Sequence, residues 1–196
     1  PMPLNPFGEG KARYRSLMVD YQSGFYDLQL LERKSDASKH IYDVRDAVKE
    51  RFKDDRFTIL KVDNAKETNS TDLTENLKAN GIRIINSPPY AHQANGDVEV
   101  RMRINENSAI TMMVQAGLGK EFWGLACKYA AIVDQLVPYA KQRFKGKPNT
   151  PADLYREGHK LRGDITPQLI KVFGCDVIYC VPPEKRKSMD PRGSLG

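Results

Sequence analysis

The sequence predicts an α/β fold, in which strand patterns and helix patterns alternate along one chain. Two apolar, aromatic-containing runs near the start flank a turn signal, which is typical of a hairpin. Residues 35–52 then carry apolar positions at helical spacing. Residues 57–62 are almost continuously apolar, as is typical of a strand that is buried on both faces of a sheet. A sheet with helices packed against it is therefore expected.

The hairpin and the first helix are the clearest local predictions. Residues 14–19 have strand composition, residues 22–24 (Gln-Ser-Gly) form a turn signal, and residues 25–31 return to aromatic and aliphatic strand formers. The helix is predicted over residues 35–52, with Ser35 or Asp36 as its N-cap. Its apolar side chains recur every three or four residues, at Ala37, Ile41, Val44, Val48 and Phe52.

A second strand–helix–strand unit follows the first helix. The strand at residues 57–62 precedes a helix whose start is marked by Asp72 with Glu75 three residues later, which resembles a capping box. Gly81 supplies a stop signal, and residues 82–85 return to strand character. The predicted order so far is strand, strand, helix, strand, helix, strand.

Two further helices are predicted after a loop. Prolines exclude regular structure at residues 87–96, and a helix follows from about residue 97 to residue 116. Arg101 and Arg103 are expected to project away from the core, and the core-facing positions of this helix are Val98, Met102, Ile110, Met113 and Val114. Residues 120–139 have a denser apolar pattern and form the next predicted helix.

The chain is expected to divide into a core and a small extension. Residues 1–140 are assigned to the core, and residues 141–196 to a linker and a C-terminal extension. Within the extension, residues 141–147 are basic, a short helix is predicted around residues 152–156, and residues 171–181 have strand character.

Composition favours a polyanionic partner and argues against several other classes of protein. Thirty-one Lys and Arg residues against 25 Asp and Glu residues give a formal charge of +6 and a pI near 9.2, although a generic basic surface explains this balance equally well. The three cysteines and three histidines lack paired spacing, so no structural zinc site is predicted. No apolar run approaches the roughly 18 to 20 residues of a membrane span, and no signal peptide is legible, so no membrane partner is expected.

Two carboxylates are placed where chemistry is common. Asp63 directly follows the strand at residues 57–62, and Glu99 lies in the first turn of the helix after the proline-rich loop, with 35 residues between them (99 − 63 − 1). Hard divalent ions take oxygen ligands, and phosphodiester chemistry uses two ions roughly 3.5 to 4 Å apart. Taken singly, each residue is as well explained by capping or by the helix dipole.

The surroundings of these carboxylates carry a family resemblance. Val62-Asp63-Asn64 with Glu67, followed by residues 89–99 (Pro-Tyr-Ala-His-Gln-Ala-Asn-Gly-Asp-Val-Glu), resembles the D-35-E signature of retroviral and retrotransposon integrases. The resemblance continues, in the order seen in copia-type polyproteins, through Ala116-Gly117-Leu118, Phe122-Trp123, Thr150-Pro151 and Val172-Phe173-Gly174-Cys175. It therefore covers nearly the whole chain.

This resemblance implies a fold, a chemistry and a set of residue roles. The fold would be ribonuclease-H-like, a mixed sheet flanked by helices with a small C-terminal extension. Asp63 and Glu99 would be the second and third acidic ligands of a catalytic centre that holds Mg²⁺ or Mn²⁺, two ions in an intact family member. The loop of residues 92–96 would be the mobile catalytic loop. The residues implied to meet nucleic acid are His92, Gln93, Asn95, Arg101 and Arg103. For His92 an ordinary surface or packing role is favoured, and the two arginines are also explained as solvated charges.

The family pattern also implies that the first of the three catalytic carboxylates is missing from this chain. Members of the family carry it in an Asp-x-x-Gly-Pro segment, and this chain opens at Pro1, just after the position of that glycine. Asp20 is assigned a structural role, because the copia-type pattern has a non-catalytic Asp there. Ala65, Asp97 and Val100 depart from the usual glycine, apolar residue and arginine, which indicates a divergent copy.

Three functional hypotheses follow. The first is a fragment of a polynucleotidyl transferase that joins element DNA ends to target DNA, with a homo-oligomer as the intact enzyme and an intracellular, nuclear site of action for the parent integrase. The second is an inactive nucleic-acid-binding remnant of an integrase. The third is a ribonuclease-H-like transposase or ribonuclease, which the fold alone does not exclude.

Overall fold

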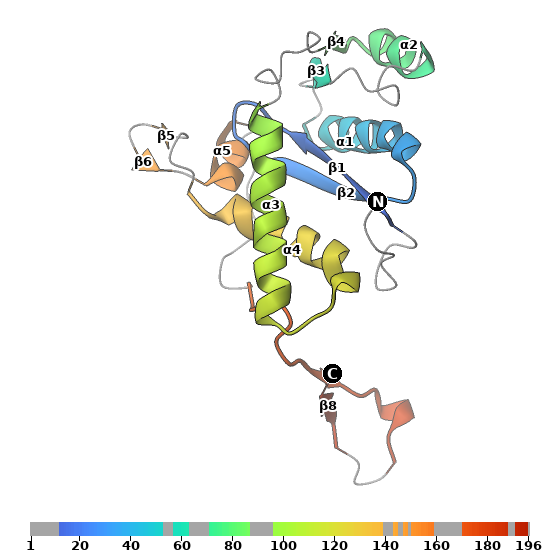
Figure 1. The fold of residues 1–196 in the computed structure, drawn as a ribbon. Helices are drawn as coiled ribbons and strands as arrows, with labels where there is room; N and C mark the ends of the chain where they lie inside the picture. Colours follow the sequence, from blue (N-terminus) through green and yellow to red (C-terminus); the bar gives the residue numbers. More distant parts are fainter. Residues whose placement is uncertain are drawn as a thin grey trace.

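The structure is a computed structural model that describes residues 12–52, 57–62, 71–86, 96–138, 143–144, 147–148, 150–158, 170–187 and 191–195. Figure 1 shows how the strands and helices are arranged. In this part of the chain, no helix is long and apolar enough to cross a membrane.

The predicted hairpin is confirmed. Strand β1 (Tyr14–Val19) pairs antiparallel with β2 (Tyr26–Leu31), in a register that runs from Tyr14 opposite Leu31 to Val19 opposite Tyr26. In the turn, the Asp20 carboxylate accepts hydrogen bonds from the Ser23 backbone N–H at 2.8 Å and from the Ser23 hydroxyl at 2.5 Å. Gly24 takes a positive φ of 68°, which glycine adopts without strain. Asp20 therefore stabilises the turn, which agrees with the structural role predicted for it.

The two faces of this hairpin are covered by different helices. Successive side chains of a strand point to opposite faces, so Met18 packs toward α1 (Ala37–Phe52), whereas Leu17 packs toward the helices of the second half of the chain. His40 of α1, 1% exposed, bonds through Nε2 to the Asp27 carboxylate of β2 at 2.9 Å. Helix α1 is therefore fixed to the hairpin by an apolar contact and a polar contact.

The second strand pair is parallel. Strand β3 (Ile59–Val62) pairs with β4 (Arg83–Asn86), and α2 (Thr71–Ala79) lies between them in the chain. One apolar cluster joins this unit to α1 and contains Ile41, Leu60, Val62, Leu73, Leu77 and Ile82, with Met18 of β1 packed against it. The mixed strand arrangement is confirmed, as one antiparallel and one parallel pair. Within the described ranges these pairs share side-chain packing and no backbone ladder.

Helices α3 (Gly96–Gln115) and α4 (Trp123–Leu136) cover the other face of the hairpin (Figure 1). A short 3-10 turn, η3 (Lys120–Phe122), leads into α4. Small side chains allow these elements to approach closely. The cluster between them contains Ala12, Leu30, Ala109, Trp123, Ala126, Cys127 and Ala130.

The predicted core face of α3 is partly wrong. Val98, Met102 and Met113 do pack against the core. Ile110 and Val114, however, are 48% and 75% exposed, and the buried positions of the helix are Arg101, Asn105 and Ala109. Two of these three residues are polar. A prediction based only on apolar residues therefore misplaced the middle of the buried face of α3.

The C-terminal part begins with elements that contact the core. In α5 (Pro151–Gly158) the Thr150 side chain accepts a hydrogen bond from the Asp153 N–H at 3.0 Å, and Tyr155 stacks on Phe25 of the hairpin turn at 4.3 Å. The predicted short helix is thereby confirmed. The division at residues 140 and 141 stays a prediction.

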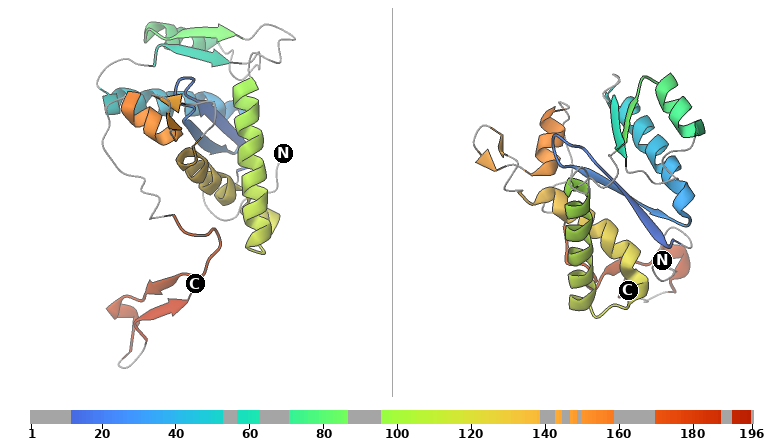
Figure 2. Two further views of the ribbon diagram at one scale, coloured as in Figure 1. Left: turned by 90° about the vertical axis from the view of Figure 1, so that its left-hand side faces the viewer. Right: turned by 45° about the horizontal axis from the view of Figure 1, so that its top comes forward.

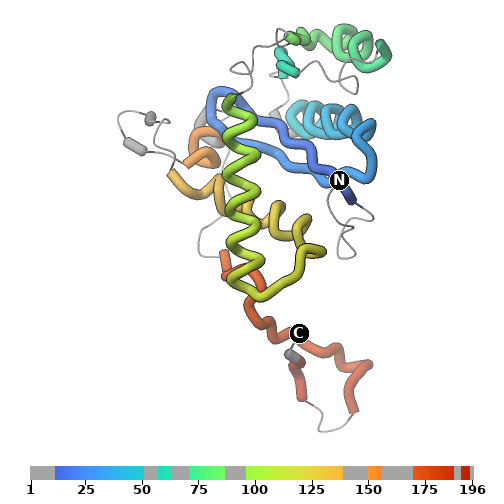
Figure 3. The backbone as a smooth tube through the Cα atoms, viewed as in Figure 1, coloured from blue at the N-terminus to red at the C-terminus, as the bar shows by residue number. Residues whose placement is uncertain are grey.

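The remaining strands are short, and the structure places β7 (Ile178–Cys180) at the end of the segment predicted as a strand, with β8 (Gly193–Leu195) as its partner. Strands β5 (Arg143–Phe144) and β6 (Lys147–Pro148) form another small pair. The tube in Figure 3 shows residues 170–187 leaving the body near the C-terminal end of α3.

A turn at residues 172–175 attaches this last segment to the core. Phe173 packs against the α3–α4 cluster, with its ring centroid 5.6 Å from that of Tyr129. The Tyr129 hydroxyl accepts a hydrogen bond from the Lys171 N–H at 3.1 Å. Gly174 has a φ of 74°, and a Cβ at this position would lie 2.5 Å from the Cβ of Ala116. Close backbone approach therefore requires glycine here.

Gly174→Ala is expected to detach this turn, because the added methyl meets the Ala116 side chain as well as straining the backbone. Amide hydrogen exchange at Lys171 should become about tenfold faster or more, as its hydrogen bond to Tyr129 opens. Gly117→Ala is the matched control, since Gly117 has a similar φ of 66° but a Cβ there would meet nothing within 4 Å. Equal exchange rates at Lys171 in both variants would contradict the docking.

Candidate functional site

The candidate site lies where the parallel strands end and α3 begins. Val62 and Asn86 are paired at the carboxyl ends of β3 and β4, and parallel strands bring these ends to the same edge. Figure 2 shows both arrowheads directed toward the N-terminal end of α3. Asp63 follows Val62 directly and lies outside the described residues.

Glu99 occupies the first turn of α3 with its side chain exposed. Carboxylates are stabilised at helix N-termini by the backbone N–H groups, and Asp97 in the same turn is exposed as well. A spacing of two residues sends the Asp97 and Glu99 side chains to different sides of the helix. The helix therefore presents Glu99 as a separate, accessible oxygen ligand.

The donor chemistry at this edge suits a hard divalent cation, for which carboxylate oxygens are the preferred ligands. The described residues include no group of three or more His, Cys, Asp or Glu side chains that could hold a metal ion. Asp63 is not among those residues, so its pairing with Glu99 stays a prediction.

The predicted nucleic-acid contacts divide into three sets. His92, Gln93 and Asn95 lie outside the described residues. Arg103 is exposed on α3, one turn after Glu99 and on the same side of the helix. Arg101 does not project outward as predicted: it is 6% exposed, and its charge acts on Tyr26 and Asp134. Arg101 belongs to the interior because α3 buries a polar stripe against the hairpin and α4.

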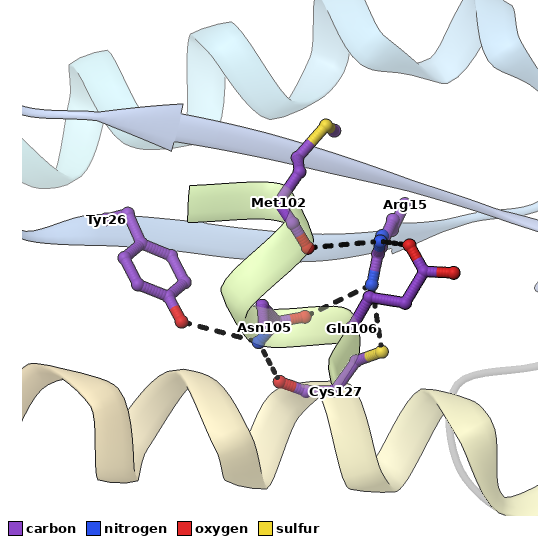
Figure 4. Close-up of polar contacts among 6 residues, drawn as sticks. All are labelled: Arg15, Tyr26, Met102, Asn105, Glu106 and Cys127. Carbon is purple, nitrogen blue, oxygen red and sulfur yellow. Dashed lines mark hydrogen bonds and ion pairs between the residues drawn. The ribbon is translucent and has the colours of Figure 1, made fainter. Parts of the chain in front are cut away.

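Asn105 of this stripe belongs to what we call the buried polar cluster, which consists of Arg15, Tyr26, Asn105, Cys127 and Asp134 (Figure 4 shows the first four). Arg15 of β1 donates from Nη1 to Asn105 Oδ1 and to Cys127 Sγ, both at 3.2 Å. From Nη2 it donates to Glu106 Oε2 at 2.8 Å and to the Met102 carbonyl at 3.4 Å. One guanidinium thus contacts both α3 and α4.

The cluster continues as a directed chain of hydrogen bonds. Asn105 Nδ2 donates to the Tyr26 hydroxyl at 3.3 Å and to the Cys127 carbonyl at 2.9 Å. The Tyr26 hydroxyl donates in turn to Asp134 Oδ2 at 2.7 Å, and Ser108 donates to the other oxygen of Asp134 at 3.4 Å. The chain runs from a cation to a carboxylate, so each bond polarises the next.

Burial sets the protonation of this cluster. It raises the pKa of Tyr26, and the hydrogen bond to Asp134 raises it further. Burial also raises the pKa of Asp134, against the lowering effect of hydrogen bonds from Tyr26 and Ser108. Burial raises the pKa of Cys127, with Arg15 opposing the shift, so Cys127 is a neutral thiol that accepts from Arg15 at neutral pH.

Sequence reasoning missed this cluster. Its members are spread over four elements, and each has an ordinary surface interpretation on its own. The one local signal was the spacing of Arg101, Asn105 and Ala109 at four-residue intervals, which places them on one face of α3.

Comparison with known sequences gives one informative relative. No known family's sequence model matches the chain. The chain is 26% identical over 192 residues to the retrovirus-related Pol polyprotein from transposon TNT 1-94 of Nicotiana tabacum. The match covers 98% of this chain and 14% of the polyprotein, so the chain spans about a seventh of the relative's length.

Three solved structures with a similar fold contain integrases. The catalytic core domain of BIV integrase matches with a TM-score of 0.53 at 18% identity, over 74% of this chain and 87% of that one. The HTLV-2 integrase catalytic core in complex with magnesium, in a trimeric form, gives 0.51 at 14% identity, over 70% and 81%. A simian T-cell lymphotropic virus intasome, in complex with the PP2A regulatory subunit B56 gamma, gives 0.56 at 16% identity, over 91% and 59%.

These matches confirm the predicted resemblance. The chain has the ribonuclease-H-like fold of integrase catalytic cores, and it is related along nearly its whole length to a segment of a retrotransposon polyprotein.

Tyr26→Phe tests the directed hydrogen-bond chain. Losing the hydroxyl removes a hydrogen-bond donor from half-buried Asp134 and an acceptor from buried Asn105, so the free energy of unfolding should fall by about 1–3 kcal/mol. Urea denaturation measures this loss. Tyr42→Phe, at a half-buried position of α1, is the control and should lower the free energy of unfolding by less than about 0.5 kcal/mol. Equal losses in the two variants would argue against the chain.

Asp134→Asn tests the protonation of the cluster. Because the pKa of Asp134 is raised in the folded state, the folded protein binds this proton more tightly than the unfolded one. This contribution to stability is complete below the ordinary carboxyl pKa and is lost as the pH rises through the raised value. Asp134→Asn should remove that loss, so its stability relative to wild type should improve as the pH rises across this window. Parallel stability curves for the two proteins would refute this assignment.

Proposed function

We propose that this chain is the catalytic-core part of a retroelement integrase, which cleaves and joins DNA phosphodiesters with divalent metal ions. The observation that carries the proposal is the convergence of the β3 and β4 carboxyl ends on the start of α3. Val62 at the end of β3 and the first turn of α3, which contains Glu99, lie toward one edge of the fold, and this supports the assignment of Asp63 and Glu99 to one site. The activity of the whole polyprotein, its substrates and its partners are part of the proposal.

Asp63 and Glu99 would hold the metal through carboxylate oxygens. When bound, two divalent ions would stabilise the attacking and the leaving oxygens of the displacement. The chain's own contribution is positional: Glu99 stands on a 20-residue helix that packs against α4 and β1, so its backbone is held in place by the core. Mg²⁺ or Mn²⁺ fits this donor set, and the magnesium in the HTLV-2 core supports the choice.

Arg103 is the exposed cation on the Glu99 side of α3. Guanidinium groups bind phosphates through charge-assisted, often bidentate hydrogen bonds. We propose that Arg103 meets the DNA backbone beside the carboxylates, together with His92, Gln93 and Asn95 of the preceding loop. Element ends and target DNA would be the substrates.

A homo-oligomer acting in the nucleus is proposed for the parent enzyme, and the intasome and trimeric structures among its neighbours support the oligomer.

A second candidate is an inactive, nucleic-acid-binding remnant. The observation that favours it is Asp97, which is exposed in the same helical turn as Glu99 where the family pattern has an apolar residue, and whose charge would perturb the affinity for a metal ion. The same basic chain would then bind DNA without cleaving it.

Strand transfer separates these two candidates. It should be assayed with Mg²⁺ and with Mn²⁺, in this chain and in a longer version that carries an Asp-x-x-Gly segment before Pro1. In the active version, Asp63→Asn and Glu99→Gln should each reduce the rate about a hundredfold or more, since losing one charge-stabilising group costs on the order of 10²–10³. Asp72→Asn, another exposed carboxylate in a first helical turn, is the control. Full activity in both site variants would defeat the proposal, and DNA binding without activity in either version would favour the remnant.

Arg103→Ala tests the phosphate contact. Affinity for a duplex, measured by fluorescence anisotropy, should fall severalfold irrespective of sequence, and the slope of log K against log salt should decrease by about one. Lys120→Ala removes an exposed cation beyond the far end of α3 and should change neither quantity. If the two variants behaved alike, Arg103 would be an ordinary solvated charge.

A further inference from the structure

We propose that Arg15 is a positioning residue: from β1 it sets the rotation of α3 about its own axis and thereby aims Glu99 at the ends of β3 and β4. The inference rests on the proposed function, because it names what holds one of that site's two carboxylates in place.

Arg15 stands on an otherwise apolar face of β1. Residues 15, 17 and 19 point to the same side of the strand, and Leu17 and Val19 pack there against α3 and α4. The Arg15 side chain is only 8% exposed, although its position in the strand would suit an aliphatic residue. A buried charge is costly, and well-packed apolar groups often replace one without loss of stability. The presence of Arg15 is therefore better explained by specificity than by stability.

The contacts of Arg15 supply that explanation. Three of its four acceptors lie on one short stretch of α3: the Met102 carbonyl, Asn105 Oδ1 and Glu106 Oε2. The fourth is Cys127 Sγ on α4. A guanidinium presents its donors in a rigid planar fork, so several acceptors are satisfied together at one orientation of the helix. Rotation of α3 in either direction would break some of these bonds.

Helical geometry transmits this orientation to Glu99. Glu106 is seven residues after Glu99 (106 − 99), which is about two turns of 3.6 residues, so the two side chains leave α3 on nearly the same side. Asn105 faces the interior, is fully buried, and is held from β2 and α4 as well as by Arg15. Glu106 is bound to Arg15 of β1, and Asn105 is held in the interior. These contacts fix the rotation of α3 and therefore the direction in which the Glu99 side chain leaves the helix.

The test uses this chain and Mn²⁺ as the probe. Paramagnetic broadening of backbone amide signals reports where the ion sits and at what concentration it binds. Work at 0.5 M NaCl, where the Debye length is about 4 Å, suppresses effects that come only from changed surface charge. In the wild type, broadening at the lowest Mn²⁺ concentrations is expected at Val62 and in the first turn of α3.

Arg15→Met should weaken the apparent Mn²⁺ affinity at this site about five- to tenfold, and Arg15→Lys, which keeps the charge without the fork, about twofold to threefold. Glu106→Gln, at a half-exposed position that tolerates the change, should weaken it about twofold and keeps the test valid if Arg15→Met does not fold. Ala130→Gly destabilises the same core without touching an Arg15 contact and should leave the affinity unchanged. A purely structural role would make Ala130→Gly and the Arg15 variants behave alike, which would overturn the proposal.

Failure of the proposed function has a different signature. If Asp63→Asn and Glu99→Gln leave the local broadening intact, the site assignment itself is wrong, whatever the Arg15 variants do. If those two variants abolish it while folded Arg15→Lys and Glu106→Gln bind Mn²⁺ as the wild type does, the site stands and the positioning role is refuted.

Discussion

The guanidinium of Arg15 begins a chain of hydrogen bonds that passes through Asn105 and Tyr26 to the Asp134 carboxylate. Along this chain each donor group binds the next acceptor, with the Arg15 guanidinium at one end and the Asp134 carboxyl group at the other. Because β1, α3, β2 and α4 each contribute a member, the four elements that form the larger half of the core are oriented by one network. The apolar packing around the network buries surface area, whereas the network fixes how the four elements are oriented, because hydrogen bonds tolerate little rotation.

The rest of the molecule is arranged around this half. Met18 and Asp27 place α1 on the opposite face of the hairpin, and the apolar cluster of α1 carries the parallel β3–β4 pair with it. The carboxyl ends of that pair then lie toward the start of α3. The candidate site is thus assembled from two units that are packed separately, with Glu99 on one and the end of β3 on the other. Its geometry depends on how accurately each unit is held.

The 170–187 segment shows a different use of close packing. Phe173 and Gly174 dock on the α3–α4 corner, far along α3 from Glu99, and α5 docks on the hairpin turn through Tyr155. Both contacts are local and rest on an aromatic ring. The 170–187 segment is therefore attached to the core near the C-terminal end of α3, away from Glu99 in the first turn of that helix (Figure 3).

The sequence by itself determined the local elements and the family resemblance. Turn chemistry fixed the hairpin around Ser23 and Gly24, helical periodicity fixed α1, and the setting of Asp63 and Glu99 pointed to integrase cores. Tertiary structure alone decided which side of α3 is buried. Periodicity counts apolar side chains, so it placed Ile110 and Val114 inside and Arg101 outside. The folded chain instead buries Arg101, whose charge acts on Asp134, and it buries Asn105, which has hydrogen-bond partners on other elements. Burial of a polar residue depends on its hydrogen-bond partners. Because those partners are distant in sequence, a local pattern does not predict it.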